Sequence, residues 1–298
     1  MKKLLIVGAS SFIGANLAMR LRKHYQVYGT FHHHRPQLDQ VPLIRFNINR
    51  KSDTAKLCKF VKPDVILYCV EVVRNHGTGE NEESNHFLNS ECACLFAQNL
   101  TPSTRMIFFS TAEVFSGAEG NYDESFAPEP VTGLGQSKLI GERFLRNYPS
   151  CTTVRLGSVF GIGSFHQQGT LSTLLKRLRK NEKFDVAAHE SRSFVPIESV
   201  TRITQSIIED SAPESVVHIG GNEALSYYQF AEKVADTFGY SMKGVSAAQP
   251  PPSPNHREGA PRNFSLNSDA AMEKYGITFP SISEGLKDIR TQLSLGQQ

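Results

Sequence analysis

Short apolar runs, most of them followed by a helical pattern, fill the first half of this 298-residue chain. The runs are continuous rather than alternating, as expected for parallel strands that are covered on both faces. Strands separated by helices form right-handed βαβ units, so the sequence predicts an α/β fold with a doubly wound parallel sheet, the Rossmann architecture. We predict strands at residues 3–7, 26–31, 43–48, 64–70, 105–110 and 152–156, and helices at 13–23, 53–60, 84–99 and 136–146.

The pattern changes after about Gly161. Leucines at positions 171, 174, 175 and 178 share one face of a predicted helix, and basic residues at 176, 177, 179 and 180 lie largely opposite. That basic face is either a solvated surface or a source of attraction for an anionic substrate. We also predict strands at 184–187 and 216–219, a capping box of Ser226 and Gln229 that opens a helix running to Phe238, and a proline-rich loop at 249–262.

These elements predict two unequal parts. Residues 1–160 are expected to form the Rossmann domain, and 184–220 are expected to return to it. Residues 161–298 are expected to form a smaller, loop-rich α+β lobe that binds substrate. In an open parallel sheet a ligand lies in the crevice at the carboxyl ends of the strands, so the site is expected where the lobe meets that edge.

Composition excludes several classes of function. The net charge is only +3 and no long run of one sign occurs, so bulk charge does not indicate a nucleic-acid partner. No apolar stretch approaches the roughly 20 residues that span a bilayer, and the apolar amino terminus leads into a glycine turn rather than a cleavage site. The five cysteines lack a Cys-x-x-Cys spacing, which favours reduced thiols in a cytoplasmic protein without a metal site.

A glycine-containing turn joins the first predicted strand to the first predicted helix. Gly8 allows the tight turn, and Gly14 lets the helix pack closely on the strand. Backbone N–H groups of Ser11, Phe12 and Ile13 open the helix, where the helix dipole favours a pyrophosphate. This strand–turn–helix context predicts a dinucleotide cofactor. A turn that no longer binds cofactor is the alternative, since Ser11 restricts the backbone more than glycine does.

The end of the second strand indicates which dinucleotide is preferred. An acidic residue at that place would hold the ribose 2′-hydroxyl of NAD, but this chain continues through His32 to Arg35 without an acid. Arg35 and one of the histidines can instead accept a 2′-phosphate. The sequence therefore favours NADP over NAD. Three consecutive histidines do not readily converge on one ion, so a polar loop is the preferred interpretation of that run.

Several segments resemble the extended short-chain dehydrogenase/reductase superfamily, in the correct order and over nearly the whole chain. The turn resembles its Gly-x-x-Gly-x-x-Gly fingerprint, with Ser11 at the middle glycine. The segment from Thr111 to Gly117 resembles the end of its fifth strand, and the segment from Leu134 to Lys138 resembles its active-site helix. Residues 264–267 and 275–280 resemble the terminal segment of dTDP-4-dehydrorhamnose reductases, although Ala260 replaces the arginine that opens this segment in the family.

The resemblance implies a set of site residues. Thr111 would hydrogen-bond the substrate carbonyl, and Lys138 would hold the nicotinamide ribose. Leu134 stands where the family has the tyrosine that gives a proton to the substrate, and loss of such an acid costs about 10²–10⁴-fold in rate. Cys69 and Leu156 are expected at the cofactor, and Asn89 and Glu113 at the substrate; an ordinary exposed loop carboxylate is the alternative for Glu113, and Glu198 takes the place of a family aspartate.

These residues leave three hypotheses open. The first is an NAD(P)-binding protein of the nucleotide-sugar reductase or epimerase type, whose hydride transfer is impaired or atypical. The second is an active dTDP-4-keto-sugar reductase or epimerase that uses another acid, for which Tyr122 is one stand-in. The third is a regulatory, non-catalytic subunit of another enzyme; the regulatory subunit of methionine adenosyltransferase resembles this family. The ligand would be a nucleotide-sugar or another small molecule, with a protein partner in the regulatory case and a homodimer as the family's frequent assembly.

Overall fold

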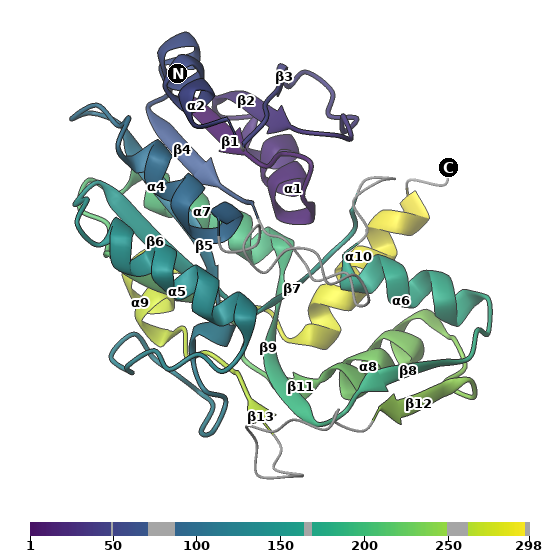
Figure 1. The fold of residues 1–298 in the computed structure, drawn as a ribbon. Coiled ribbons are helices and arrows are strands. Elements are labelled where there is room, and N and C mark those ends of the chain that lie inside the picture. Colours follow the sequence, from purple (N-terminus) through teal and green to yellow (C-terminus); the bar gives the residue numbers. More distant parts are fainter. Residues whose placement is uncertain (49, 71–86, 164–168, 249–261, 296–298) are drawn as a thin grey trace.

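A seven-stranded parallel sheet forms the centre of the protein (Figure 1). The computed structural model describes residues 1–48, 50–70, 87–163, 169–248 and 262–295. The strand order is β10-β6-β5-β4-β1-β2-β3 and every neighbouring pair is parallel, which confirms the predicted doubly wound α/β sheet. The strands are β1 (Lys3–Val7), β2 (Gln26–Phe31), β3 (Leu43–Arg45), β4 (Val65–Tyr68), β5 (Arg105–Thr111), β6 (Cys151–Leu156) and β10 (Val216–Ile219).

Helices cover both faces of this sheet, as the continuous apolar strands require. In β1, Leu4 and Ile6 belong to one buried apolar cluster, while Leu5 and Val7 belong to another. The first cluster is completed by helices α1 (Phe12–Leu21) and α7 (Ile197–Glu209). The second is completed by the helices α2 (Lys51–Val61) and α4 (Cys92–Ala97), together with part of α5 (Gly133–Leu145). Successive side chains of a strand point to opposite faces, so one strand contributes to both layers.

The second lobe has its own apolar core. Helices α6 (Thr170–Arg179), α8 (Tyr227–Phe238) and α10 (Ile282–Leu295) share it, with Phe194 and Phe230 stacked at its centre. Its central strand β9 (Glu190–Pro196) pairs with β7, β11 and β13, and a separate pair joins β8 to β12. These strands are β7 (Ser158–Phe160), β8 (Phe184–Ala187), β11 (Ala224–Ser226), β12 (Val245–Ala248) and β13 (Arg262–Asn263). Helix α9 (Asp269–Tyr275) packs against β10.

Some predicted boundaries were wrong. The third strand ends at Arg45 rather than at residue 48. The predicted helix at 84–99 is a π-helical turn, Phe87–Glu91, followed by α4; residues 84–86 lie outside the described residues. The capping box of Ser226 and Gln229 is confirmed, and α8 ends at Phe238 as predicted. The predicted loop lies outside the described residues up to position 261, and the domain boundary at residue 160 stays a prediction.

Candidate functional site

A cavity of about 830 Å³ lies at the carboxyl edge of the sheet. Its walls include Ser10 after β1, Cys69 after β4, Thr111 at the end of β5 and Leu156 at the end of β6. The opposite wall comes from the second lobe, with residues of α6, β8, β9 and α8. The site therefore lies at the edge where an open parallel sheet binds its ligands.

The turn after β1 forms one end of the cavity. Gly8 has a φ of +87°, and a Cβ on Gly14 would lie 2.3 Å from the Gly8 carbonyl oxygen, so helix and strand approach as closely as glycine allows. Ser11 has an extended backbone with φ of −80°, and its hydroxyl accepts a hydrogen bond from the Gly14 N–H at 3.0 Å. Serine is therefore accommodated here without backbone strain, as the N-cap of α1.

The amino end of α1 fits a dinucleotide pyrophosphate. Ser11, Phe12 and Ile13 line the cavity, and the first turn of the helix contains no acidic residue. Helix N-terminal N–H groups and the positive end of the helix dipole both attract phosphate. Cys69 lies at the same end; burial raises the pKa of its thiol, with Lys138 acting in the opposite direction, so it forms a neutral wall.

The two residues predicted to select NADP lie outside this cavity. Arg35 is exposed and lines a separate hollow formed with residues 36–39, 41 and 43. The His32 ring lies 3.8 Å from the His33 ring, centroid to centroid. Burial, and then the neighbouring His33 and Arg45, lower the pKa of His32, so its imidazole is neutral near pH 7. A contact of either side chain with a 2′-phosphate stays a prediction.

Three of the predicted catalytic positions meet in the cavity. Lys138 and Leu134 lie one turn apart on α5, and both line the cavity together with Thr111. The Lys138 ammonium is buried and donates to the carbonyl oxygens of Val70 and Phe109, each at 2.9 Å. These two bonds hold the lysine at the bottom of the cavity, whereas Leu134 presents only hydrocarbon to it.

Asn89 is not among the residues that line the cavity. It is fully buried, and its Nδ2 donates to the Ser137 hydroxyl at 3.0 Å. Ser137 in turn donates to the Leu134 carbonyl at 2.9 Å, so Asn89 fixes the first turn of α5. Its contact with substrate stays a prediction. Tyr122 is also buried away from the lining residues, stacked on Phe115 with ring centroids 4.3 Å apart.

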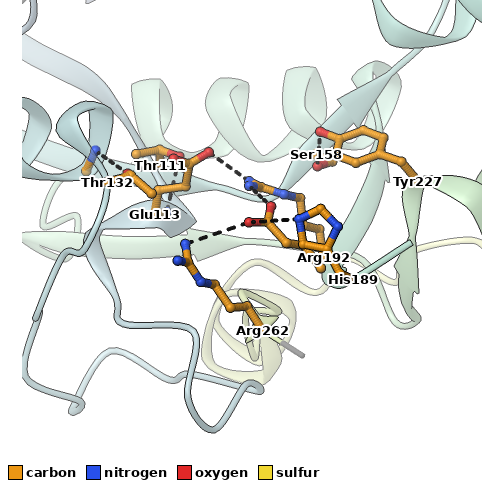
Figure 2. A network of polar contacts seen from close by, with 10 residues as sticks. Thr111, Glu113, Thr132, Ser158, His189, Arg192, Tyr227 and Arg262 are labelled. Carbon is orange, nitrogen blue, oxygen red and sulfur yellow. Dashed lines mark hydrogen bonds and ion pairs between the residues drawn. The ribbon is translucent and has the colours of Figure 1, made fainter. Parts of the chain in front are cut away.

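Glu113 is the centre of a polar network (Figure 2). Its carboxylate lies 2.9 Å from Arg192 Nη1 and accepts a hydrogen bond from the Thr132 hydroxyl at 2.7 Å. The Glu113 side chain is only 16% exposed, so it is not an ordinary exposed loop carboxylate. Glu198 lies elsewhere, paired with Arg20 on the surface at 2.8 Å.

Arg192 was missed by the sequence reasoning. It donates to Glu190 at 3.0 Å as well as to Glu113, and Arg262 approaches Glu190 at 3.8 Å. Burial acts to lower the pKa of Arg192, but Tyr227 and the two carboxylates raise it overall, so the guanidinium stays charged. The signal available in the sequence was a single arginine among polar residues, just before the apolar run of Phe194 and Val195.

Tyr227 and Ser158 were missed as well. Both line the cavity, and their hydroxyl oxygens lie 3.0 Å apart (Figure 2). Ser158 comes two residues after the end of β6, and Tyr227 is the first residue of α8. Capping by Ser226 fixes the residue at which α8 begins, and this positions the Tyr227 side chain in the cavity wall.

The family is decided by a comparison over nearly the full length. A sequence model described as the RmlD substrate binding domain matches residues 1–295. The chain belongs to this family. A methionine adenosyltransferase 2 subunit beta from Danio rerio is 26% identical over 183 residues, which are 59% of this chain and 56% of that protein. The chain thus spans little more than half the length of that relative.

Solved structures agree on the fold. The dTDP-4-dehydrorhamnose reductase of Bacillus anthracis, solved in complex with NADP, has a TM-score of 0.78 and 19% identity, with 98% of each chain covered. The UDP-glucose 4-epimerase of Thermotoga maritima, solved with UDP-glucose, has a TM-score of 0.82 and 19% identity, covering 99% of this chain and 100% of that one. Both structures share the fold of this chain over nearly its full length.

Two other features are absent from the described ranges. No helix there is long and apolar enough to cross a bilayer. No group of three or more histidine, cysteine, aspartate or glutamate side chains comes together there in a way that would hold a metal ion.

Proposed function

We propose that this protein binds a nicotinamide dinucleotide and a nucleotide-sugar in its cavity, and that its hydride-transfer chemistry is impaired or atypical. One observation carries the proposal. Leu134 faces the cavity one turn before Lys138, where the family has its proton-donating tyrosine, while the cofactor end of the cavity keeps a fitting geometry. The loss is therefore confined to the group that acts on substrate.

Different residues of the cavity would bind different groups of the two ligands. The amino end of α1 would hold the pyrophosphate, and Lys138, which two carbonyl oxygens fix in the cavity, would hydrogen-bond the ribose of the nicotinamide half. Thr111 offers its hydroxyl to a substrate carbonyl. The dinucleotide, when bound, supplies or accepts hydride. Reduction of a ketone also needs a proton on oxygen, and a leucine at 134 provides none.

NADP is the preferred dinucleotide in this proposal. Arg35 is exposed beside the end of β2, where a guanidinium can pair with a 2′-phosphate. No acidic side chain follows β2 between residues 32 and 38 to hold a 2′-hydroxyl.

A second candidate function is that of a non-catalytic subunit of another enzyme. It is favoured by the relative named methionine adenosyltransferase 2 subunit beta, together with the loss of the tyrosine. In that case the dinucleotide would stabilise the fold or the assembly with a protein partner, and hydride transfer would be absent.

Titration with NADPH and NADH, followed by an assay of hydride transfer to a dTDP-4-keto-6-deoxy sugar, tests the proposal. We expect binding of NADPH and slow transfer. Replacing Leu134 by tyrosine should raise the transfer rate, by up to about 10²–10⁴-fold, because it restores an acid beside Lys138. Ile140→Tyr, at an exposed position of the same helix, is the matched control and should change nothing. Wild-type turnover at the rate of ordinary reductases, or binding of neither dinucleotide, would refute the proposal.

A further inference from the structure

Tyr227 lies in the cavity wall, at a position other than the one where the family has its tyrosine. Among the described residues that line it, the hydroxyl-bearing side chains are serines and threonines apart from Tyr227. A phenol releases its proton far more readily than an alcohol does, so Tyr227 is the strongest hydroxyl acid in that wall. It comes from the second lobe, on the side of the cavity opposite Leu134 and Lys138.

Contacts on three sides hold the Tyr227 side chain in place. Its hydroxyl lies 3.0 Å from the Ser158 hydroxyl, which is anchored on β7 just after the Rossmann strand β6. The edge of its ring packs against Phe194, with centroids 5.3 Å apart and planes at 86°. The Arg192 guanidinium lies 5.8 Å from the centre of the ring. The hydroxyl is thus directed toward Ser158 of β7.

Charged side chains of both signs lie near Tyr227 in the cavity wall. The Arg192 guanidinium is a neighbouring cation. The carboxylates of Glu113 and Glu190 are each paired directly with Arg192, and Asp185 is a further acidic residue in the lining. Two ion pairs therefore hold Arg192 beside the Tyr227 ring.

We propose that Tyr227 is the proton donor of this cavity, taking over from the tyrosine that Leu134 replaces, and that Ser158 positions its hydroxyl. This inference rests on the proposed function, which supplies a reduced nicotinamide as the reductant. The carbonyl carbon of the substrate receives hydride, and its oxygen receives the proton as the O–H bond of Tyr227 breaks. The phenolate is then reprotonated from solvent, and the ketone has become a secondary alcohol.

Tyr227→Phe removes the hydroxyl and keeps the ring, so it tests the contribution of the hydroxyl alone. Tyr228→Phe is the matched control, because Tyr228 is the next residue of α8 and does not line the cavity. The first readout needs no cofactor: calorimetric titration of the dTDP-4-keto-6-deoxy sugar into the apoprotein. Loss of one hydrogen bond to the keto oxygen should weaken binding about 2–10-fold in Tyr227→Phe and leave Tyr228→Phe unchanged.

The second readout is single-turnover hydride transfer with NADPH. Tyr227→Phe should slow it by about 10²–10⁴-fold with unchanged affinity for NADPH. Ser158→Ala should slow it less, and Ser158→Thr, which keeps a hydroxyl, should restore the rate. Equal rates in wild type and Tyr227→Phe would overturn the inference while the proposed function stands, and so would a wild type that binds NADPH but transfers no hydride. A wild type that binds no dinucleotide would instead remove the proposed function, and the inference with it.

Discussion

Replacing Glu142 by glutamine tests how the site-bearing helix α5 is anchored. Glu142 lies on α5 and pairs with Arg155 of β6: Arg155 Nη2 is 2.8 Å from one carboxylate oxygen, and Nε is 3.2 Å from both. Both side chains are 3% exposed. The Ser110 hydroxyl, next to Thr111, donates to the same carboxylate. The substitution keeps the shape of the side chain and leaves Arg155 as a buried, uncompensated charge.

The expected loss is large because the pair is buried. Breaking a buried ion pair by removing one partner costs about 3–5 kcal/mol of unfolding free energy. A 298-residue chain has an unfolding entropy of roughly 0.6 kcal/mol per kelvin, so Tm should fall by about 5–8 °C. Glu182→Gln is the matched control, since Glu182 pairs with Arg177 at the surface with side chains 40% and 37% exposed. That pair should contribute about 0–1 kcal/mol.

Urea unfolding at neutral pH, followed by circular dichroism, measures both variants. The urea slope should be unchanged if only the native contact is lost. If Glu142→Gln lost no more free energy than Glu182→Gln, the buried pair would not anchor α5. Lys138 would then owe its position to its bonds with the Val70 and Phe109 carbonyl oxygens and to the packing of the helix.

Further predictions concern the cofactor and pH. Arg35→Ser should weaken NADPH binding about tenfold and leave NADH binding unchanged, measured by fluorescence titration; equal losses for both would contradict a 2′-phosphate contact. Lys138→Met should weaken both dinucleotides, because the ribose loses its donor, and unchanged affinities would exclude that role. Burial and the neighbouring Arg155 lower the pKa of His218 to about 4. The unfolded chain therefore binds a proton that the folded chain does not, so unfolding free energy should fall by as much as about 3 kcal/mol as pH drops from 6.5 to 4, and His218→Gln should reduce this dependence.

The sheet could be predicted from the sequence because its strands are buried on both faces. An uninterrupted apolar run such as Leu4–Val7 indicates, from the local sequence alone, that both faces of the strand are buried. The carboxyl ends of parallel strands then bring Thr111 and Leu156 to one edge of the sheet without any knowledge of the connections. This part of the cavity follows from strand direction alone.

The opposite wall could not be predicted, because it depends on pairing between distant segments. Glu113 and Arg192 are 79 residues apart, and Ser158 and Tyr227 are 69 apart. Neither pair follows from a periodicity, since each joins segments that lie far apart in the sequence. No local pattern in the sequence encodes such contacts.

The early start of α5 shows tertiary packing overriding helix propensity. Gly133 and Gly135 are poor helix formers, which argued for a later start at residue 136. A Cβ on Gly135 would lie 1.9 Å from the Glu113 carbonyl oxygen, so only glycine lets the helix approach the turn after β5. Thr132 caps the helix by accepting the Gly135 N–H at 3.0 Å. The close approach to Glu113 therefore requires glycine at position 135, although glycine is a poor helix former.

Strand β9 passes into helix α7 without a loop, since the strand ends at Pro196 and the helix begins at Ile197. Arg192 stands on the strand, while α7 packs against α1, with an ion pair between Glu198 and Arg20. One uninterrupted segment therefore carries both the arginine of the cavity wall and the packing contact with α1.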